Sequence, residues 1–212
     1  MKHSIDDQKP VWLFLGKLLD AAVLHVLWLL CCLPVVTFGA STSALYDVMM
    51  KSAANEDGHY YRMFFRSFKS NLRKGIVLGL IFLVLEGMLL WSFFLCTWNA
   101  ELNPSLLYFR IPAVVLMVLF FMMFEYVFPL QARFENTVPM TLRNGFLLSV
   151  RNLGWTIVMT LIPAAFYALV IWLEKYLLPL MVWGFGLIAF LQAFILNRIF
   201  RPFIEAGTDE EA

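Results

Sequence analysis

The stretch IVLGLIFLVLEGMLLWSFFLCTW, residues Ile76–Trp98, decides the fold class of this chain. At a rise of about 1.5 Å per residue, a helix of this length crosses the roughly 30 Å of hydrocarbon in a bilayer. Its apolar residues do not alternate with polar ones, as they would in a strand of a membrane barrel, and Glu86 is its only charged residue. Gly75 and Gly79 form a GxxxG spacing at its start, which permits close approach of a second helix. The stretch therefore predicts a membrane-spanning α-helix.

The composition of the whole chain agrees with this prediction. Of its 212 residues, 61% are hydrophobic and 15% are charged, and the mean hydropathy is +0.76. Soluble domains have about 45–50% apolar and about 25% charged residues. A soluble core of this length could not bury so much apolar surface, whereas lipid accepts it.

Further apolar runs of similar length flank this stretch on both sides. They are Leu106–Leu130, Gly154–Leu173, Leu177–Leu196 and the less regular Val11–Pro34. Two of the links are short, Asn99–Ser105 and Glu174–Tyr176, so each of the two pairs of runs that they join is predicted to form an antiparallel helical hairpin. We therefore predict an all-α fold, a polytopic transmembrane helical bundle that forms a single membrane domain over residues 1–212. Its hydrophobic spans, about five, lie near 11–34, 76–98, 106–130, 154–173 and 177–196.

Lysine and arginine residues predict the orientation of the chain, because in short loops they favour the cytoplasmic side. Lys51–Lys74 holds six of them, and Gln131–Leu153 holds three, whereas Asn99–Ser105 holds none. We therefore expect the polar segments 51–74, 131–153 and 197–212 in the cytoplasm. The chain would then be a multi-pass protein of the cell membrane with a cytoplasmic C-terminus.

The path before residue 51 stays open. Pro34 lacks an amide donor and ends or kinks the first helix. Val35–Met50, rich in Ser, Thr and Ala, then re-enters the membrane, crosses it as a short second helix or lies on its surface. A single crossing would leave Lys2, Lys9 and Lys17 outside, against the charge rule, whereas a crossing and return would place them inside. The side of the N-terminus is therefore undecided.

Two polar stretches have the pattern of amphipathic helices on the predicted cytoplasmic face. Tyr61–Lys74 places four cations on one helix face, with aromatic rings about a quarter turn away. These cations are Arg62, Arg66, Lys69 and Arg73. Met140–Leu153 places Arg143 and Arg151 on polar faces. Each stretch either binds a partner or lipid, or only orients the chain and lies in the membrane interface.

Ionisable side chains inside apolar runs are the first candidates for a functional site, since burying them in lipid is costly. They are Glu86, His25, Asp20, Arg110 and Glu125. Glu86 is the sharpest candidate, because it lies near the middle of its span. One hypothesis places Glu86 on a path for a solute or proton. The other has it pair with His25 or Arg110, or stay protonated, and fix helix packing, while Arg110 and Glu125 reach toward the interfaces.

The chain shows no pattern of a catalytic site. It contains no HExxH, GxSxG, P-loop or GxGxxG motif. Cys31, Cys32 and Cys96 lie in apolar runs without metal-ligand spacing and are interpreted as small packing residues. We therefore expect no enzymatic activity, cofactor, metal site or nucleic-acid partner, and the lipid bilayer as the main surrounding.

Two segments resemble the YesL-like family of bacterial integral membrane proteins, a family of unknown function. They are LLCCLPVVTFGASTSALYDVMMK (Leu29–Lys51) and FFRSFKSNLRKG (Phe64–Gly75). The stretch Pro129–Thr137 and the pair Arg143–Asn144 are also similar to the family, so the resemblance extends over roughly residues 10–200. The matching positions are mostly Gly, Pro, Ser, Thr and aromatic residues, which indicates a shared backbone path more than shared chemistry.

This resemblance implies a role beside carbohydrate uptake by ABC transporters. The function expected from the sequence is thus a non-catalytic accessory or regulatory component, with a carbohydrate ABC transporter or another membrane protein as its partner. A permease subunit is not expected, because Gln131–Leu153 lacks the EAA-type coupling pattern. The alternative is a small solute transporter or channel with Glu86 on the path.

Overall fold

A computed structural model describes residues 10–56, 58–99, 104–173 and 177–210, which form helices joined by short connections. The helices are α1 (Pro10–Cys32), η2 (Val35–Thr37), α2 (Phe38–Ala53), α3 (Tyr60–Trp98), η4 (Pro104–Phe109), α4 (Arg110–Arg133), α5 (Val138–Arg151), α6 (Leu153–Trp172) and α7 (Leu177–Glu210). Within the described residues there is no strand, and α1, α3, α4, α6 and α7 each contain a segment long and apolar enough to cross a membrane. The predicted all-α membrane fold is confirmed.

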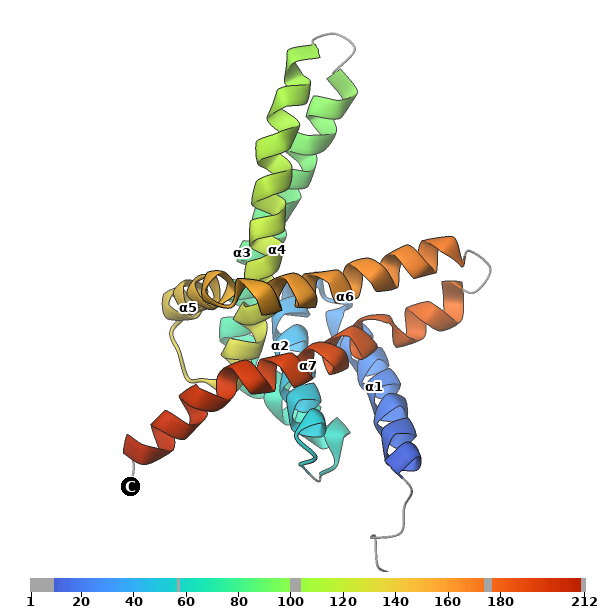
Figure 1. Ribbon diagram of the computed structural model, residues 1–212, viewed down its shortest axis with the longest axis vertical. Helices are drawn as coiled ribbons and strands as arrows, with labels where there is room; N and C mark the ends of the chain where they lie inside the picture. The colour runs from blue at the N-terminus through green and yellow to red at the C-terminus, as the bar shows by residue number, and fades with distance from the viewer. Residues whose placement is uncertain (1–9, 57, 100–103, 174–176, 211–212) are drawn as a thin grey trace, which may run out of the picture.

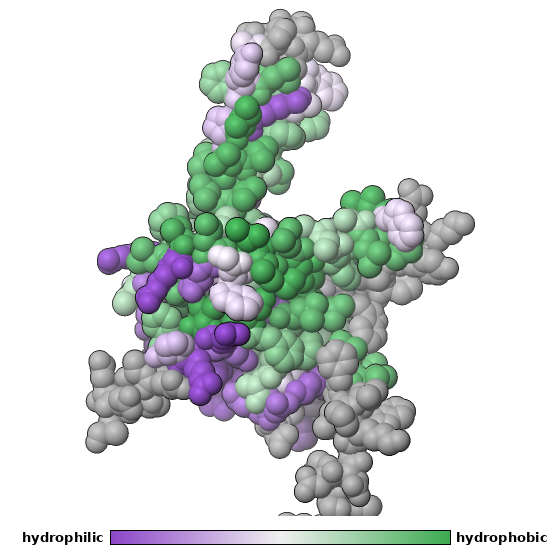
Figure 2. All heavy atoms as spheres, viewed as in Figure 1, coloured by the Kyte–Doolittle hydropathy of each residue, from purple (hydrophilic) through white to green (hydrophobic). Residues whose placement is uncertain are grey.

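The helices radiate from a shared centre that contains α2. Figure 1 shows the α3–α4 hairpin and the α6–α7 hairpin extending from this centre in different directions, with α1 beside α2. Large apolar side chains remain exposed on both hairpins, including Trp91, Trp98, Ile111, Ile171 and Trp172. Figure 2 shows this apolar surface over the hairpins, while hydrophilic residues gather at the lower part of the molecule in this view. Exposed apolar surface of this extent fits a hydrocarbon surrounding.

The segment whose path the sequence left open forms α2 and lies inside the protein. All residues from Gly39 to Met50 are buried by the surrounding helices. α1 ends at Cys32, just before Pro34, and the Thr37 hydroxyl donates to the carbonyl oxygens of Cys31 and Pro34, at 2.6 Å each. The Ser, Thr, Ala and Gly residues of this segment are therefore a signature of close helix packing.

α2 runs back antiparallel to α1. The Trp28 Nε1–H donates to Thr42 Oγ1 at 3.1 Å, and nearer the other end of the pair Lys17 hydrogen-bonds Asn55, just beyond α2. The start of α1 therefore lies at the same end of the protein as the connection from α2 to α3. The chain therefore turns back along α1 after Pro34.

Three glycines bring α2 and α3 into backbone contact. A Cβ atom built on Gly39 would lie 2.1 Å from the carbonyl oxygen of Gly75 and 2.8 Å from the amide nitrogen of Gly79. A Cβ on Gly79 would lie 2.8 Å from the amide nitrogen of Gly39. The GxxxG spacing thus lies at the crossing of the two helices, where only hydrogen fits.

The stretch expected as a separate surface helix, Tyr61–Lys74, is the first part of α3. α3 continues without interruption through Trp98, and its 39 residues extend over roughly 58 Å at 1.5 Å per residue, about twice the hydrocarbon thickness. Phe64, Ser67 and Asn71 are buried on one side of this part. The helix is therefore held by protein contacts and does not float freely in the interface. At the other end of the chain, α7 continues to Glu210, beyond the predicted end of the last span at residue 196.

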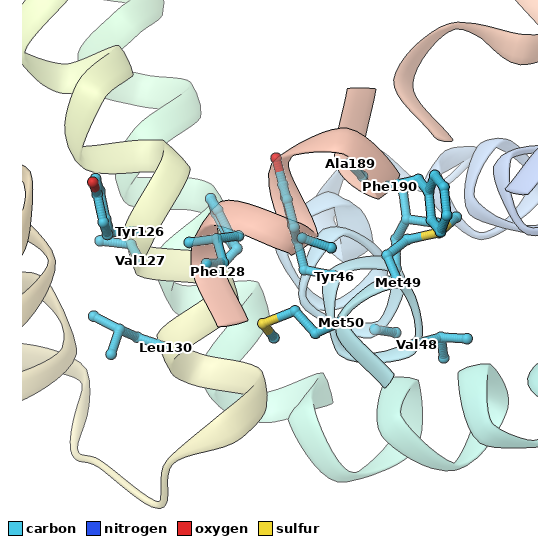
Figure 3. Close-up of a cluster of buried hydrophobic side chains, with 14 of the residues drawn as sticks. Tyr46, Val48, Met49, Met50, Tyr126, Val127, Phe128, Leu130, Ala189 and Phe190 are labelled. Atoms are coloured by element: carbon cyan, nitrogen blue, oxygen red, sulfur yellow. The ribbon is translucent and has the colours of Figure 1, made fainter. Parts of the chain in front are cut away.

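The core lies where α2, α4 and α7 meet. Figure 3 shows Tyr46 and Met50 of α2, Phe128 of α4 and Phe190 of α7 in this cluster, and all four are at most 1% exposed. Phe128 also packs against Phe82 of α3, with ring centroids 5.6 Å apart. Burial of such rings contributes about 1.5–3 kcal/mol each where water is the alternative surrounding. In lipid, shape complementarity and paired polar groups have more weight than the hydrophobic effect.

Candidate functional site

A buried polar cluster links four helices near the centre of the protein. We call it the Glu125 network, and it consists of Tyr46 (α2), Glu125 (α4), Thr160 (α6) and Gln192 (α7). Gln192 Nε2 donates to Glu125 Oε1 at 3.0 Å, and the Thr160 hydroxyl donates to Glu125 Oε2 at 3.1 Å. The Tyr46 hydroxyl donates to Gln192 Oε1 at 2.6 Å. Each oxygen of the carboxyl group thus has a donor, as a buried polar group requires.

A second set of hydrogen bonds extends this network along α6. The hydroxyls of Tyr126 and Thr156 are 2.9 Å apart, and the Thr156 hydroxyl also lies 2.8 Å from the carbonyl oxygen of Ser149 in α5. Gln192 Nε2 donates in addition to the carbonyl oxygen of Met159 at 3.1 Å. Since Glu125, Tyr46 and Gln192 are each 1% exposed, the network joins helices in a closed interior. This arrangement fixes helix positions and gives a solute no direct access to the carboxyl group.

Glu86 lies on the α3–α4 hairpin and takes no part in this network. Its side chain is half-buried, and it forms no hydrogen bond or ion pair with any residue that the structure describes. The pairing with His25 or Arg110 considered from the sequence is therefore absent. His25 instead accepts a hydrogen bond at Nδ1 from the amide of Gly186, at 3.1 Å, and stacks on Trp28.

We expect Glu86→Gln to change the free energy of unfolding by less than about 0.5 kcal/mol, the usual range for substitutions away from specific contacts. Thermal unfolding in detergent, followed by tryptophan fluorescence, measures this. Glu125→Leu provides the comparison, because it removes the acceptor of two buried hydrogen bonds. A loss of stability for Glu86→Gln as large as that for Glu125→Leu would contradict the placement of Glu86.

The other two intramembrane candidates lie apart from each other. Asp20 lines a small pocket of about 250 Å³ between α1 and the start of α3, together with His59 and Tyr60. Arg110 begins α4 near the tip of the hairpin, with its guanidinium 5.7 Å from the ring centroid of Phe93. Neither residue joins the Glu125 network.

The basic residues predicted on helix faces lie on the surface. Arg62, Arg66, Lys69 and Arg73 are all exposed on α3, opposite the side that is buried against the rest of the protein. We call these four side chains the basic face of α3. Arg143 and Arg151 are exposed on α5.

A polar pocket opens between α2, α3 and the end of α4. We call it the α2–α3–α4 pocket, and its volume is about 560 Å³. It is lined by Asp47, Lys51, Met63, Arg66, Ser67, Ser70, Ala132 and Arg133, so Arg66 belongs both to the basic face of α3 and to this pocket. Lys51 Nζ lies 2.9 Å from Asp47 Oδ1, and Arg133 Nη2 lies 3.6 Å from Glu56 Oε1.

Several residues of these two sites were not among the sequence candidates. Tyr46, Thr160 and Gln192 complete the Glu125 network, and Lys51 and Arg133 line the pocket. A sequence signal existed for α6, because Thr156 and Thr160 are polar, four residues apart and inside an apolar run, which places them on one helix face. In the sequence, Lys51 and Arg133 were used only to predict which segments face the cytoplasm.

Comparison with known proteins gives one match. Residues 21–93 match the family described as Protein of unknown function, DUF624. The matched segment begins in α1, includes all of α2 and most of α3, and so contains the glycine contact and the basic face of α3. No curated protein and no solved structure matches the chain in the other two comparisons. The match agrees with a membrane protein and assigns no activity.

Proposed function

We propose that this chain is a non-catalytic accessory component of a membrane transport system that binds its partner through the basic face of α3. The observation that carries the proposal is that this helix displays four cations while its opposite side is buried in the protein. The cations are therefore held on a fixed scaffold. A fixed set of like charges suits an acidic protein surface, because complementary charge guides and orients association.

The partner we propose is a component of a carbohydrate ABC transporter. The support for it is the resemblance of Leu29–Lys51 and Phe64–Gly75 to the YesL-like family. The distribution of Lys and Arg supports a cytoplasmic position for the basic face and the C-terminus. The return of α2 supports the same orientation, because it brings Lys17 to the end of the protein that holds Lys51.

The alternative of a solute path at Glu86 has less support. Glu86 lies on a two-helix arm, and no described residue forms a hydrogen bond or ion pair with it. A conducting path through an apolar region needs several polar groups along its length.

Co-purification from cells grown on the transported carbohydrate tests the proposal. The wild-type chain, extracted in mild detergent, is expected to retain a transporter component. The variant Arg62→Gln/Lys69→Gln/Arg73→Gln is expected to bind it roughly tenfold more weakly at low salt, since each exposed charge contributes about 0.2–1 kcal/mol. The swap Arg62→Lys/Lys69→Arg/Arg73→Lys keeps every charge and is the matched control. Absence of any transporter component from the wild-type sample, or equal recovery with the glutamine variant, would refute the proposal.

A further inference from the structure

The α2–α3–α4 pocket gathers cations from three separate helices. Lys51 comes from the last turn of α2, Arg66 from the first part of α3 and Arg133 from the last turn of α4. Residues so distant in sequence meet only through the tertiary fold. The pocket is thus a feature of the folded protein and differs from a run of basic residues that merely orients the chain.

The carboxylates near the pocket leave much of this positive charge unpaired. Asp47 is the one acidic residue that lines it, and among the described residues it forms a hydrogen bond and ion pair with Lys51 only. Glu56 lies 3.6 Å from Arg133 and is itself half-exposed, so this is a weak, solvent-screened pair. Arg66 forms no hydrogen bond or ion pair with any residue that the structure describes. An ammonium group has three donors and a guanidinium has five, so most donors of these three cations stay available.

Hydroxyl groups add neutral hydrogen-bonding capacity to the same wall. Ser67 Oγ accepts a hydrogen bond from Asn71 Nδ2 at 3.3 Å, and its own O–H finds no acceptor among the described residues. Ser70 Oγ lies beside it and donates to the carbonyl oxygen of Ser67 at 2.9 Å. The pocket therefore presents the Ser67 hydroxyl as a donor, together with one ammonium and two guanidinium groups.

We propose that the α2–α3–α4 pocket binds a phosphate group, carried by a soluble phosphate ester or by the head group of an anionic phospholipid. Phosphate has several oxygen acceptors and its charge suits three cations, and the planar guanidinium of arginine binds two of its oxygens at once. A volume of about 560 Å³ is within the usual range of ligand pockets and leaves room for the group attached to the phosphate. Asp47 would then hold Lys51 in place and also limit the affinity, because it competes with the ligand for that ammonium group.

Thermal unfolding of the purified full chain in detergent tests binding of inorganic phosphate. Phosphate is expected to raise the melting temperature of the wild type above its value in chloride at equal ionic strength, because a ligand of the folded state stabilises it. Arg66→Gln/Arg133→Gln is expected to weaken phosphate binding roughly tenfold or more, since it removes two charged donors. Arg198→Gln/Arg201→Gln removes the same charge from α7 and is expected to retain the effect.

Asp47→Asn gives a test in the opposite direction. It removes the competing carboxylate and is expected to strengthen phosphate binding. If the Asp47–Lys51 pair served only to hold the fold together, this variant would show weaker binding or none. That result would overturn the proposal.

Nanodiscs distinguish the two sources of the phosphate. Native mass spectrometry of protein released from phosphatidylglycerol nanodiscs, with phosphatidylcholine nanodiscs as control, reports which lipid stays bound. Phosphatidylglycerol retained by the wild type and lost from Arg66→Gln/Arg133→Gln supports a lipid head group. A specific effect of free phosphate without retained lipid supports a soluble ester.

The proposal fails if phosphate acts no differently from chloride and lipid retention is the same in both proteins. Arg66 belongs to both the pocket and the basic face of α3, but these measurements use purified protein without any partner, so their outcome does not depend on partner binding.

Discussion

Replacing Gly39 by alanine is expected to lower the free energy of unfolding by about 3 kcal/mol, the upper part of the range for overpacked cores. The added methyl carbon would lie 2.1 Å from the carbonyl oxygen of Gly75. A flexible side chain could relieve such an overlap by changing its rotamer, but a backbone atom cannot. α2 and α3 would have to separate, and α2 also packs on α4 and α7. For a chain of this length, we expect a fall in melting temperature of roughly 6–12 °C.

Gly87→Ala is the matched control for this prediction. Gly87 is in the same apolar region of α3, and a Cβ atom there would meet no heavy atom within 4 Å. Alanine favours a helix over glycine by about 1 kcal/mol in water, so this variant should be at least as stable as the wild type. Size-exclusion chromatography with fluorescence detection after heating measures both variants. Equal melting of Gly39→Ala and Gly87→Ala would show that the α2–α3 contact is not as close as described.

Gln192→Leu is expected to have the second large effect, a loss of about 3–5 kcal/mol. The leucine cannot replace three buried hydrogen bonds, those from Tyr46, to Glu125 and to the carbonyl oxygen of Met159. Each buried polar group left without a partner costs about 1–3 kcal/mol. The packing volume hardly changes, so the loss would come from the polar groups.

A double-mutant cycle with Tyr46→Phe separates the hydrogen bonds from packing. In the wild-type background Tyr46→Phe removes a 2.6 Å hydrogen bond and should cost about 1 kcal/mol. In the Gln192→Leu background the Tyr46 hydroxyl already lacks this partner, so removing it should cost nothing or stabilise the protein. Thermal unfolding of the wild type, the two single variants and the double variant gives the four free energies of unfolding that the cycle compares. Strict additivity would mean that Tyr46 and Gln192 act independently.

The apolar helices could be predicted from sequence because span length and composition are local properties. The buried position of α2 could not be predicted, although its sequence is clearly rich in small residues. Its Ser, Ala and Gly residues would suit a surface, a re-entrant segment or a packed interior. The choice depends on Gly75 and Gly79, more than 35 positions away from Gly39. Small residues permit close packing, but their partner is determined by the tertiary fold.

The two carboxylates show the same limit for the candidate site. Glu86 and Glu125 both lie within apolar runs, and Glu86 is nearer to the middle of its span. The structure buries Glu125, because Thr160 and Gln192 supply donors from α6 and α7, 35 and 67 residues away. The position of a carboxylate within a span indicates the free-energy cost of burying its charge. Whether it has hydrogen-bond partners depends on the neighbouring helices. The basic face of α3 was easier to predict, since its cations repeat with the period of a single helix.

The glycine contact has a consequence for the α2–α3–α4 pocket. Lys51 and Arg66 stand on two helices whose main chains touch further along, at Gly39 and Gly79, so the spacing of these two cations is set by the main chain. Arg133 stands on α4, whose end is joined to α3 by a side-chain hydrogen bond from Gln131 to Asn71, 3.1 Å long. Main-chain contact thus positions two walls of the pocket, and a hydrogen bond between buried side chains positions the third. A substitution that separates α2 from α3 at the glycine contact is therefore expected to change the distance between Lys51 and Arg66 as well, although neither residue lies at that contact.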